Sequence, residues 1–230
     1  PTCRRPLPIG GACPSYTHSL TKFTEEQIML ILCSNGLSNA KLQAYAQQYL
    51  AECKKAALVV TADNVYKENN YHVPRCINEL KEHGLSVDIF DLDKDAPEKL
   101  LNYDVVEFIG GNPFYLLHSI RTCHAEEILQ TIADEKVLIG WSAAVFVFGP
   151  TLELVNTYSP EMNFLQLTDL SALALTALEI LPHYSKFLSR FDRFEERCRE
   201  YELTHNISVL RLNDGDGLFI SQSASWLIRA

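Results

Sequence analysis

Ser142 has the clearest potential for nucleophilic chemistry in this sequence. It follows the apolar run Val137-Leu-Ile-Gly-Trp141 and precedes the apolar run Ala143-Ala-Val-Phe-Val147, a pattern that predicts a strand, a sharp turn and a helix. Such a turn places a serine hydroxyl at the carboxyl edge of a sheet, and the backbone N–H at the helix start can face a developing oxyanion. Serine also caps helices very often. This stretch alone is therefore compatible with a nucleophile and with an N-cap.

A second turn with small residues follows the apolar segment Val105–Ile109. Residues 110–114 read Gly-Gly-Asn-Pro-Phe, and the two glycines expose backbone N–H groups. In a parallel sheet this turn would lie beside Ser142, at the crevice where α/β proteins bind ligands. The structural alternative is a turn in which Asn112 is the N-cap and Pro113 the first helical residue. Both interpretations can hold together.

A serine nucleophile needs a general base, and the chain contains seven histidines. His183 follows the apolar run Glu179-Ile-Leu-Pro182, so the carboxyl end of a strand can deliver it to Ser142. His18 lies in an N-terminal segment without periodicity, and His205 precedes a late strand. The other four lie on or beside predicted helices, where exposed or capping roles are ordinary: His72, His83, His118 and His124. His183 is therefore the predicted base.

The elements that must position these residues alternate along the chain. Short apolar runs predict strands at Ile28–Cys33, Ala57–Thr61, Ser86–Phe90, Val105–Ile109 and Val137–Gly140. The segments between them predict helices at Asn39–Glu52, Tyr71–His83, Phe114–Thr122 and Ala125–Asp134. This order predicts an α/β fold with a doubly wound, mostly parallel sheet whose strands are buried on both faces.

Beyond Pro150 the pattern is weaker. It predicts a charged helix at Asp192–Tyr201 and strands near Ser208–Leu212 and Leu218–Ile220. The Asn-Asp-Gly-Asp-Gly stretch at 213–217 predicts a hairpin turn between these two strands. A calcium loop is the weaker interpretation, because the later Glu and the full ligand spacing are missing.

Length and composition indicate one α/β domain over residues 28–230. The chain of 230 residues is long enough for one large core and short of the length at which two full domains are expected. Residues 1–27 show no period and are rich in Pro and Gly, so they are predicted to form a flexible leader.

Composition also narrows the classes of molecule that the protein is expected to bind. The net charge is -9 without a dense Lys/Arg stripe, which argues against nucleic acid and anionic membranes. The seven cysteines lack the paired spacing of a zinc site and fit thiols in a reducing compartment, so we expect a cytoplasmic protein without a metal. Neither G-x-G-x-x-G after the first strand nor G-x-x-x-x-G-K-[ST] occurs, so we expect no cofactor. A homodimer is compatible with the sequence.

Three motifs together resemble the aspartyl dipeptidase and cyanophycinase family of serine peptidases. They are Gly110-Gly-Asn-Pro-Phe-Tyr-Leu-Leu, Ile139-Gly-Trp-Ser-Ala-Ala with Pro150-Thr-Leu, and Leu181-Pro-His-Tyr. The resemblance extends from about Met29 to Ile220 and implies a flavodoxin-like, glutamine-amidotransferase-like fold. It further implies a serine-type peptidase for small peptides, with Ser142 as nucleophile and His183 as general base. The same resemblance places the oxyanion hole at the backbone of Gly111 and Ala143, with Asn112 beside the substrate.

The sequence departs from the family pattern at two positions of the site. Thr157 stands where aspartyl dipeptidases are expected to carry the triad acid, and threonine cannot stabilise an imidazolium with charge. Cyanophycinase-like members use a Glu slightly later, which indicates Glu161 as the acid, with Glu153 and Asp192 as weaker candidates. Ala144 replaces a family glycine; alanine is strained at positive φ but suits a helix better than glycine.

A third departure concerns the substrate. By the same resemblance, aspartate-preferring relatives are expected to carry an arginine just before a Glu-x-Arg-x-Arg-Glu stretch. In this sequence Phe194 occupies the position of that arginine. Without the guanidinium, a charge-assisted contact with a substrate carboxylate is lost. The adjacent Arg193 is the predicted substrate-binding replacement. The sequence therefore predicts that the chain is not a strict aspartyl dipeptidase.

Two other functions stay open from the sequence. The departures at Thr157 and Ala144 are compatible with a degenerate family member that binds a peptide or an amino acid. An esterase of the α/β-hydrolase type needs Ser, Asp and His in chain order, which Ser142, Asp192 and His205 satisfy. Only about 88 residues follow the serine, which is short for that fold.

Overall fold

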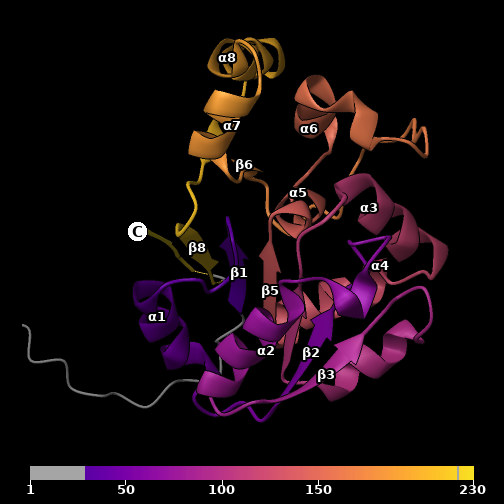
Figure 1. Cartoon of the computed structure of the whole chain (residues 1–230), viewed down its shortest axis with the longest axis vertical. Helices are drawn as coiled ribbons and strands as arrows, with labels where there is room; N and C mark the ends of the chain where they lie inside the picture. The colour runs from indigo at the N-terminus through magenta and orange to yellow at the C-terminus, as the bar shows by residue number, and fades with distance from the viewer. Residues whose placement is uncertain (1–28, 222) are drawn as a thin grey trace, which may run out of the picture.

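A seven-stranded sheet forms the centre of the protein, in the order β3-β2-β4-β5-β1-β8-β9 (Figure 1). The computed structural model describes residues 29–221 and 223–230, and the predicted leader at 1–27 lies outside them. The strands are β1 Met29–Cys33, β2 Lys55–Val59, β3 Ser86–Phe90, β4 Val105–Phe108, β5 Val137–Trp141, β8 Gly217–Ile220 and β9 Ser225–Ile228. The first five are parallel, whereas β8 runs antiparallel to both β1 and β9. The predicted α/β fold with a mostly parallel sheet is confirmed.

Helices cover both faces of this sheet because the side chains of the central strands alternate between two apolar cores. In β1, Leu30 and Leu32 pack into one core, and Ile31 and Cys33 into the other. The first core is covered by α3 (Pro113–Thr122), α4 (Glu126–Glu135) and α5 (Ala143–Phe148). The second is covered by α1 (Ala40–Leu50) and α2 (Val73–Glu82). Burial on both faces makes the strands read as continuous apolar runs.

The segment after α5 forms a smaller layer beyond the carboxyl ends of β1 and β5, at the top of Figure 1. Its elements are α6 Glu153–Tyr158, the 3-10 turn η3 Pro160–Met162, β6 Glu179–Leu181, α7 Tyr184–Arg190, α8 Phe194–His205 and β7 Val209–Arg211. Two further 3-10 turns, η1 Lys67–Asn69 and η2 Pro97–Asn102, lie earlier in the chain. Of this layer, the sequence predicted α8, β7 and the strand before His183, which is β6.

The predicted hairpin at residues 213–217 is wrong. β7 pairs with β6 in a separate two-stranded parallel sheet, whereas β8 pairs with β1 and β9. The 213–217 segment therefore crosses from the small sheet to the large one, and the N–H of Ser34 bonds to the carbonyl of Asp216 at 3.1 Å. Turn residues signal a change of direction, but they do not determine which strand the chain pairs with next. This crossing brings Asp214 to the end of β1.

Among the described residues, no helix has the length and apolar character needed to cross a membrane.

Candidate active site

Ser142 lies between β5 and α5 in a conformation that few residues other than glycine adopt. Its φ is 55° and its ψ is -108°, and its side chain makes no capping hydrogen bond with α5. The interpretation of Ser142 as an N-cap is therefore not supported by its geometry. A strained backbone of this kind persists only where the surroundings hold it, and such positions cluster at functional sites. The turn presents the serine to a cavity instead of to the helix.

The cavity, of about 550 Å³, lies at the carboxyl edge of the sheet. Its walls come from the residues that follow β1, β4 and β5, from α6 and η3, and from α7. Ser142, His183 and Asp214 all line it. Ligands of open α/β sheets bind at this edge, and the volume falls in the ordinary range for small-molecule sites.

His183 reaches the cavity from the start of α7, with a left-handed backbone (φ 57°). Its Nδ1 makes a hydrogen bond with the Asp214 carboxylate. The hydroxyl of Ser34, at the end of β1, accepts from the N–H of His183 at 2.8 Å and donates to Asp214 at 2.9 Å. With Nδ1 engaged, Nε2 is the ring nitrogen available for a proton from a substrate or a nucleophile. Burial lowers the pKa of His183, against the opposing effect of Asp214, so the neutral, proton-accepting form is favoured.

No hydrogen bond joins the Ser142 hydroxyl to His183 in the part of the chain that the structure describes, although both residues line one cavity. Hydrogen bonds of catalytic groups are often long in unliganded enzymes and shorten when substrate binds. Ser142 and His183 therefore share the cavity without a preformed hydrogen bond between them.

The carboxylate on the imidazole is Asp214, not Glu161 as the sequence indicated. Glu161 lines the same cavity from η3, but its carboxylate accepts from the Ser159 hydroxyl at 2.6 Å. That hydrogen bond lowers the pKa of Glu161. Asp214 was missed because the only signal around it was a turn motif, and its partner depends on how β8 pairs with β1.

The other acids and the alternative histidine lie outside the cavity. Glu153 contacts Nε2 of His205 at 3.0 Å, and Nδ1 of His205 bonds to the carbonyl of Tyr201. Thr157 donates its hydroxyl to the backbone of its own helix at 2.9 Å. The cavity lining includes neither His205 nor Asp192. The arrangement expected for an α/β-hydrolase esterase is therefore not brought together.

The glycines after β4 allow the backbone to approach Ser142 closely. A Cβ on Gly110 would lie 2.8 Å from the Ser142 Cβ, and a Cβ on Gly111 would lie 2.2 Å from the carbonyl oxygen of Ala62. Both Gly111 and Ala143 line the cavity, and among the described residues neither N–H has a hydrogen-bond acceptor. Two free backbone donors beside a serine are what an oxyanion hole requires.

Ala144 fits its position without strain. It is helical and fully buried in α5, so the positive φ that would require glycine is absent. Its methyl group packs near Gly140, where an added Cβ would lie 3.0 Å from the Ala144 Cβ. This departure from the family pattern leaves the turn at Ser142 intact.

Neither of the two predicted substrate-binding residues lines the cavity. The Asn112 side chain accepts from the N–H of Phe114 at 2.9 Å and from that of Tyr115 at 3.0 Å, so it caps α3. Arg193 is exposed and pairs with Glu196 on its own helix. Lys186 and Arg190, both in α7, are the cationic residues that line the cavity instead.

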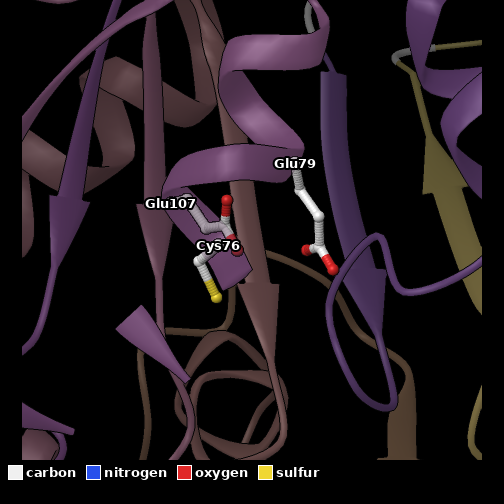
Figure 2. Close-up of side chains that lie close together, drawn as sticks. All are labelled: Cys76, Glu79 and Glu107. Atoms are coloured by element: carbon white, nitrogen blue, oxygen red, sulfur yellow. The ribbon is translucent and has the colours of Figure 1, made fainter. Parts of the chain in front are cut away.

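A buried cluster of Cys76, Glu79 and Glu107, shown in Figure 2, contacts Trp141, the residue before Ser142, through Glu107. Potential ligand atoms of these three residues lie within 4.8 Å of one another. Arg75 donates to Glu79 at 2.6 Å, so a cation from the protein already compensates this carboxylate. The structure therefore gives no reason to place a metal ion there.

Glu107 supports the turn at Ser142 from below. Its carboxylate is fully buried and accepts from Nε1 of Trp141, the residue before the serine, at 3.1 Å. Burial raises the pKa of Glu107 to about 8, with the charge of Glu79 acting in the same direction. Glu107 is thus protonated at neutral pH.

We expect Glu107→Gln to alter how stability depends on pH. The folded protein keeps a proton on Glu107 that the unfolded chain loses near its usual pKa of 4.5. The contribution of Glu107 to the free energy of unfolding therefore falls as pH rises from about 4.5 to about 8 and is constant above that. Glutamine cannot titrate, so in urea unfolding the free energy of unfolding of the variant should rise relative to that of the wild type across this pH range. Glu82→Gln, at an exposed position of α2, is the matched control; a difference between wild type and Glu107→Gln that does not change with pH would contradict the assignment.

Comparison with known proteins points to one group of enzymes. The family model described as peptidase family S51 matches residues 30–228. An uncharacterized peptidase of Listeria monocytogenes is 30% identical over 137 residues, which are 57% of this chain and 66% of that protein. Peptidase E of a Nostoc species is 26% identical over 212 residues, covering 86% of this chain and 85% of that protein.

Two solved structures share the fold. The crystal structure of a candidate peptidase E from Listeria monocytogenes EGD-e superposes with a TM-score of 0.65 at 23% identity, covering 88% of this chain and 98% of that one. A peptidase from an acI-B1 Actinobacterium superposes with a TM-score of 0.63 at 14% identity, covering 90% of this chain and 89% of that one.

Proposed function

The chain belongs to peptidase family S51, and on that premise we propose that it hydrolyses small peptides with Ser142, His183 and Asp214 as its catalytic residues. The family resemblance noted in the sequence is confirmed, and the family assignment makes the chain a serine peptidase at that level. The observation that carries the proposal is the hydrogen bond between His183 and Asp214 in the cavity that Ser142 lines.

In the proposed mechanism, Nε2 of His183 takes the proton of Ser142 as its oxygen attacks the substrate carbonyl carbon. Asp214 holds the imidazole through Nδ1 and stabilises the imidazolium that forms. The oxyanion accepts hydrogen bonds from the N–H groups of Gly111 and Ala143. The imidazolium then protonates the leaving amine, and water attacks the acyl-enzyme with His183 again as base.

Small peptides fit this site better than folded proteins. The cavity of about 550 Å³ is bounded on one side by the sheet edge and on the other by α6 and α7. This space is comparable to sites that enclose ligands of small-molecule size. A peptide of a few residues therefore fits within this volume.

A non-catalytic peptide-binding protein is the second candidate, motivated by Thr157 and Ala144. Two observations favour the enzyme over it. Asp214 supplies the carboxylate that Thr157 lacks, and Ala144 lies in a helix where alanine is unstrained. Reactivity of the serine separates the two candidates, since only a nucleophile activated by a base forms a covalent adduct readily.

We expect a fluorophosphonate probe to label Ser142 and raise the mass of the protein by one adduct. Ser142→Ala should abolish both labelling and peptide hydrolysis while the fold persists, because the change removes one oxygen at the cavity wall. Ser189→Ala, on the exposed face of α7, is the matched control and should label normally. An unlabelled wild-type protein at high probe concentration would instead favour the binding protein.

Replacing each of the two acids in the cavity by its amide distinguishes their roles. Asp214→Asn should lower kcat by about 10³-fold to 10⁴-fold, because the imidazole loses the charge that stabilises its protonated form. Glu161→Gln should change kcat far less, since its carboxylate contacts Ser159 and not the ring. Steady-state kinetics on the same peptide decides the matter; the opposite ranking would move the acid to Glu161.

A further inference from the structure

We propose that the cavity contains an apolar subsite, formed by Phe146, Tyr158, Phe187 and Phe191, that binds an aromatic or large aliphatic side chain of the substrate next to the scissile bond. This inference rests on the proposed peptidase function and adds the chemical class of the substrate. It predicts a preference for residues such as Leu and Phe over Asp and Asn.

The apolar side chains lie beside the reacting groups. Phe146 follows Ser142 by one helical turn in α5, and both line the cavity. The ring centroid of Phe187 lies 5.7 Å from that of His183, with the rings edge to face. A side chain packed against these two phenylalanines therefore lies next to the bond between serine and substrate.

The aromatic wall of the subsite, formed by Tyr158, Phe187 and Phe191, packs within itself and against Phe194. The centroid of Tyr158 lies 5.5 Å from that of Phe187 and 5.1 Å from that of Phe191. Phe194 is only 2% exposed and packs edge to face against Tyr158 at 5.0 Å. The residue that replaces the family arginine is thus part of the support for this wall. A preorganised aromatic surface costs little to order when a ligand binds.

Part of this wall is left open to a ligand. Phe187 and Phe191 line the cavity and are only half-buried, whereas Phe194 behind them is buried. Covering exposed aromatic surface with an apolar side chain releases free energy in proportion to the area removed from water. The rings of Phe187 and Phe191 offer no hydrogen-bond donor to a carboxylate, so burying an Asp side chain against them is unfavourable.

The charged residues of the cavity do not change this conclusion. Lys186, Arg190 and Glu161 are all exposed, so their charges of opposite sign lie where water screens them. The guanidinium of Arg190 lies over the ring of Phe191, 5.3 Å from its centroid. Arg193 pairs with Glu196 and lies outside the cavity. An acidic substrate side chain therefore finds no buried cation.

The test is peptide binding to Ser142→Ala, which measures the subsite without hydrolysis. Calorimetry with dipeptides whose first residue is Phe, Leu, Asp or Asn should give dissociation constants at least about 10-fold lower for Phe and Leu, the scale of one well-placed apolar group. Adding Phe191→Ala should remove most of that difference, and Phe191→Leu should restore much of it. Leu188→Ala, at an exposed position of the adjoining helix α7 and outside the cavity, is the matched control.

Three results would overturn the apolar subsite. One is tighter binding of Asp dipeptides that is lost in Arg190→Ala, which would assign the site to acidic side chains. Equal affinities for all four dipeptides, or no measurable binding of any, would also overturn it. The labelling of Ser142 in the wild type is independent of these results: a labelled serine with a preference for Asp contradicts the subsite alone, whereas an unlabelled serine contradicts the proposed catalysis.

Discussion

The hydrogen-bonded triangle of Ser34, His183 and Asp214 is the contact on which the site depends. It joins three segments that are far apart in the chain: the end of β1, the start of α7 and the crossing into β8. β1 lies between β5 and β8 in the sheet, so the Ser34 end of the triangle is anchored in the core. The small C-terminal layer carries the histidine, and the triangle attaches that layer to the sheet edge where Ser142 lies. Orientation of the imidazole by a second residue is what turns a nearby histidine into a directed base.

Ser142, the proposed nucleophile, is fixed from the other side by packing. Glycines 110 and 111 bring the β4 turn against Ser142, and no side chain would fit in their place. Trp141 fills the space beneath, where its indole N–H bonds to the protonated Glu107. Arg75 lies over the Trp141 ring at 5.5 Å and also donates to the carbonyl of Asn35, beside Ser34. The layer under the cavity thus connects the serine turn with the loop that anchors the histidine.

Local patterns in the sequence were sufficient to predict most strands of the large sheet and part of the site. The observed strands of the large sheet that were predicted begin and end within two residues of the predicted ones. Burial on both faces makes the central strands short and apolar, whereas β3, at the edge of the sheet, is largely exposed and is not buried on both faces as predicted. Ser142 and the glycine pair were found because each follows such a strand. Asp214 was not, since an Asp-Gly turn reveals nothing about its partner until β8 is paired with β1. The outward direction of Arg193 and the burial of Phe194 were equally invisible, because both depend on how α8 packs.

The most direct measurement is a crystal structure of the protein after reaction with a peptidyl phosphonate. The expected result is a covalent bond from the Ser142 oxygen, with a phosphonate oxygen within hydrogen-bond distance of the N–H groups of Gly111 and Ala143. Nε2 of His183 should face the Ser142 oxygen while Nδ1 stays on Asp214. An adduct on another residue, or an imidazole that contacts Glu161 in place of Asp214, would contradict this mechanism.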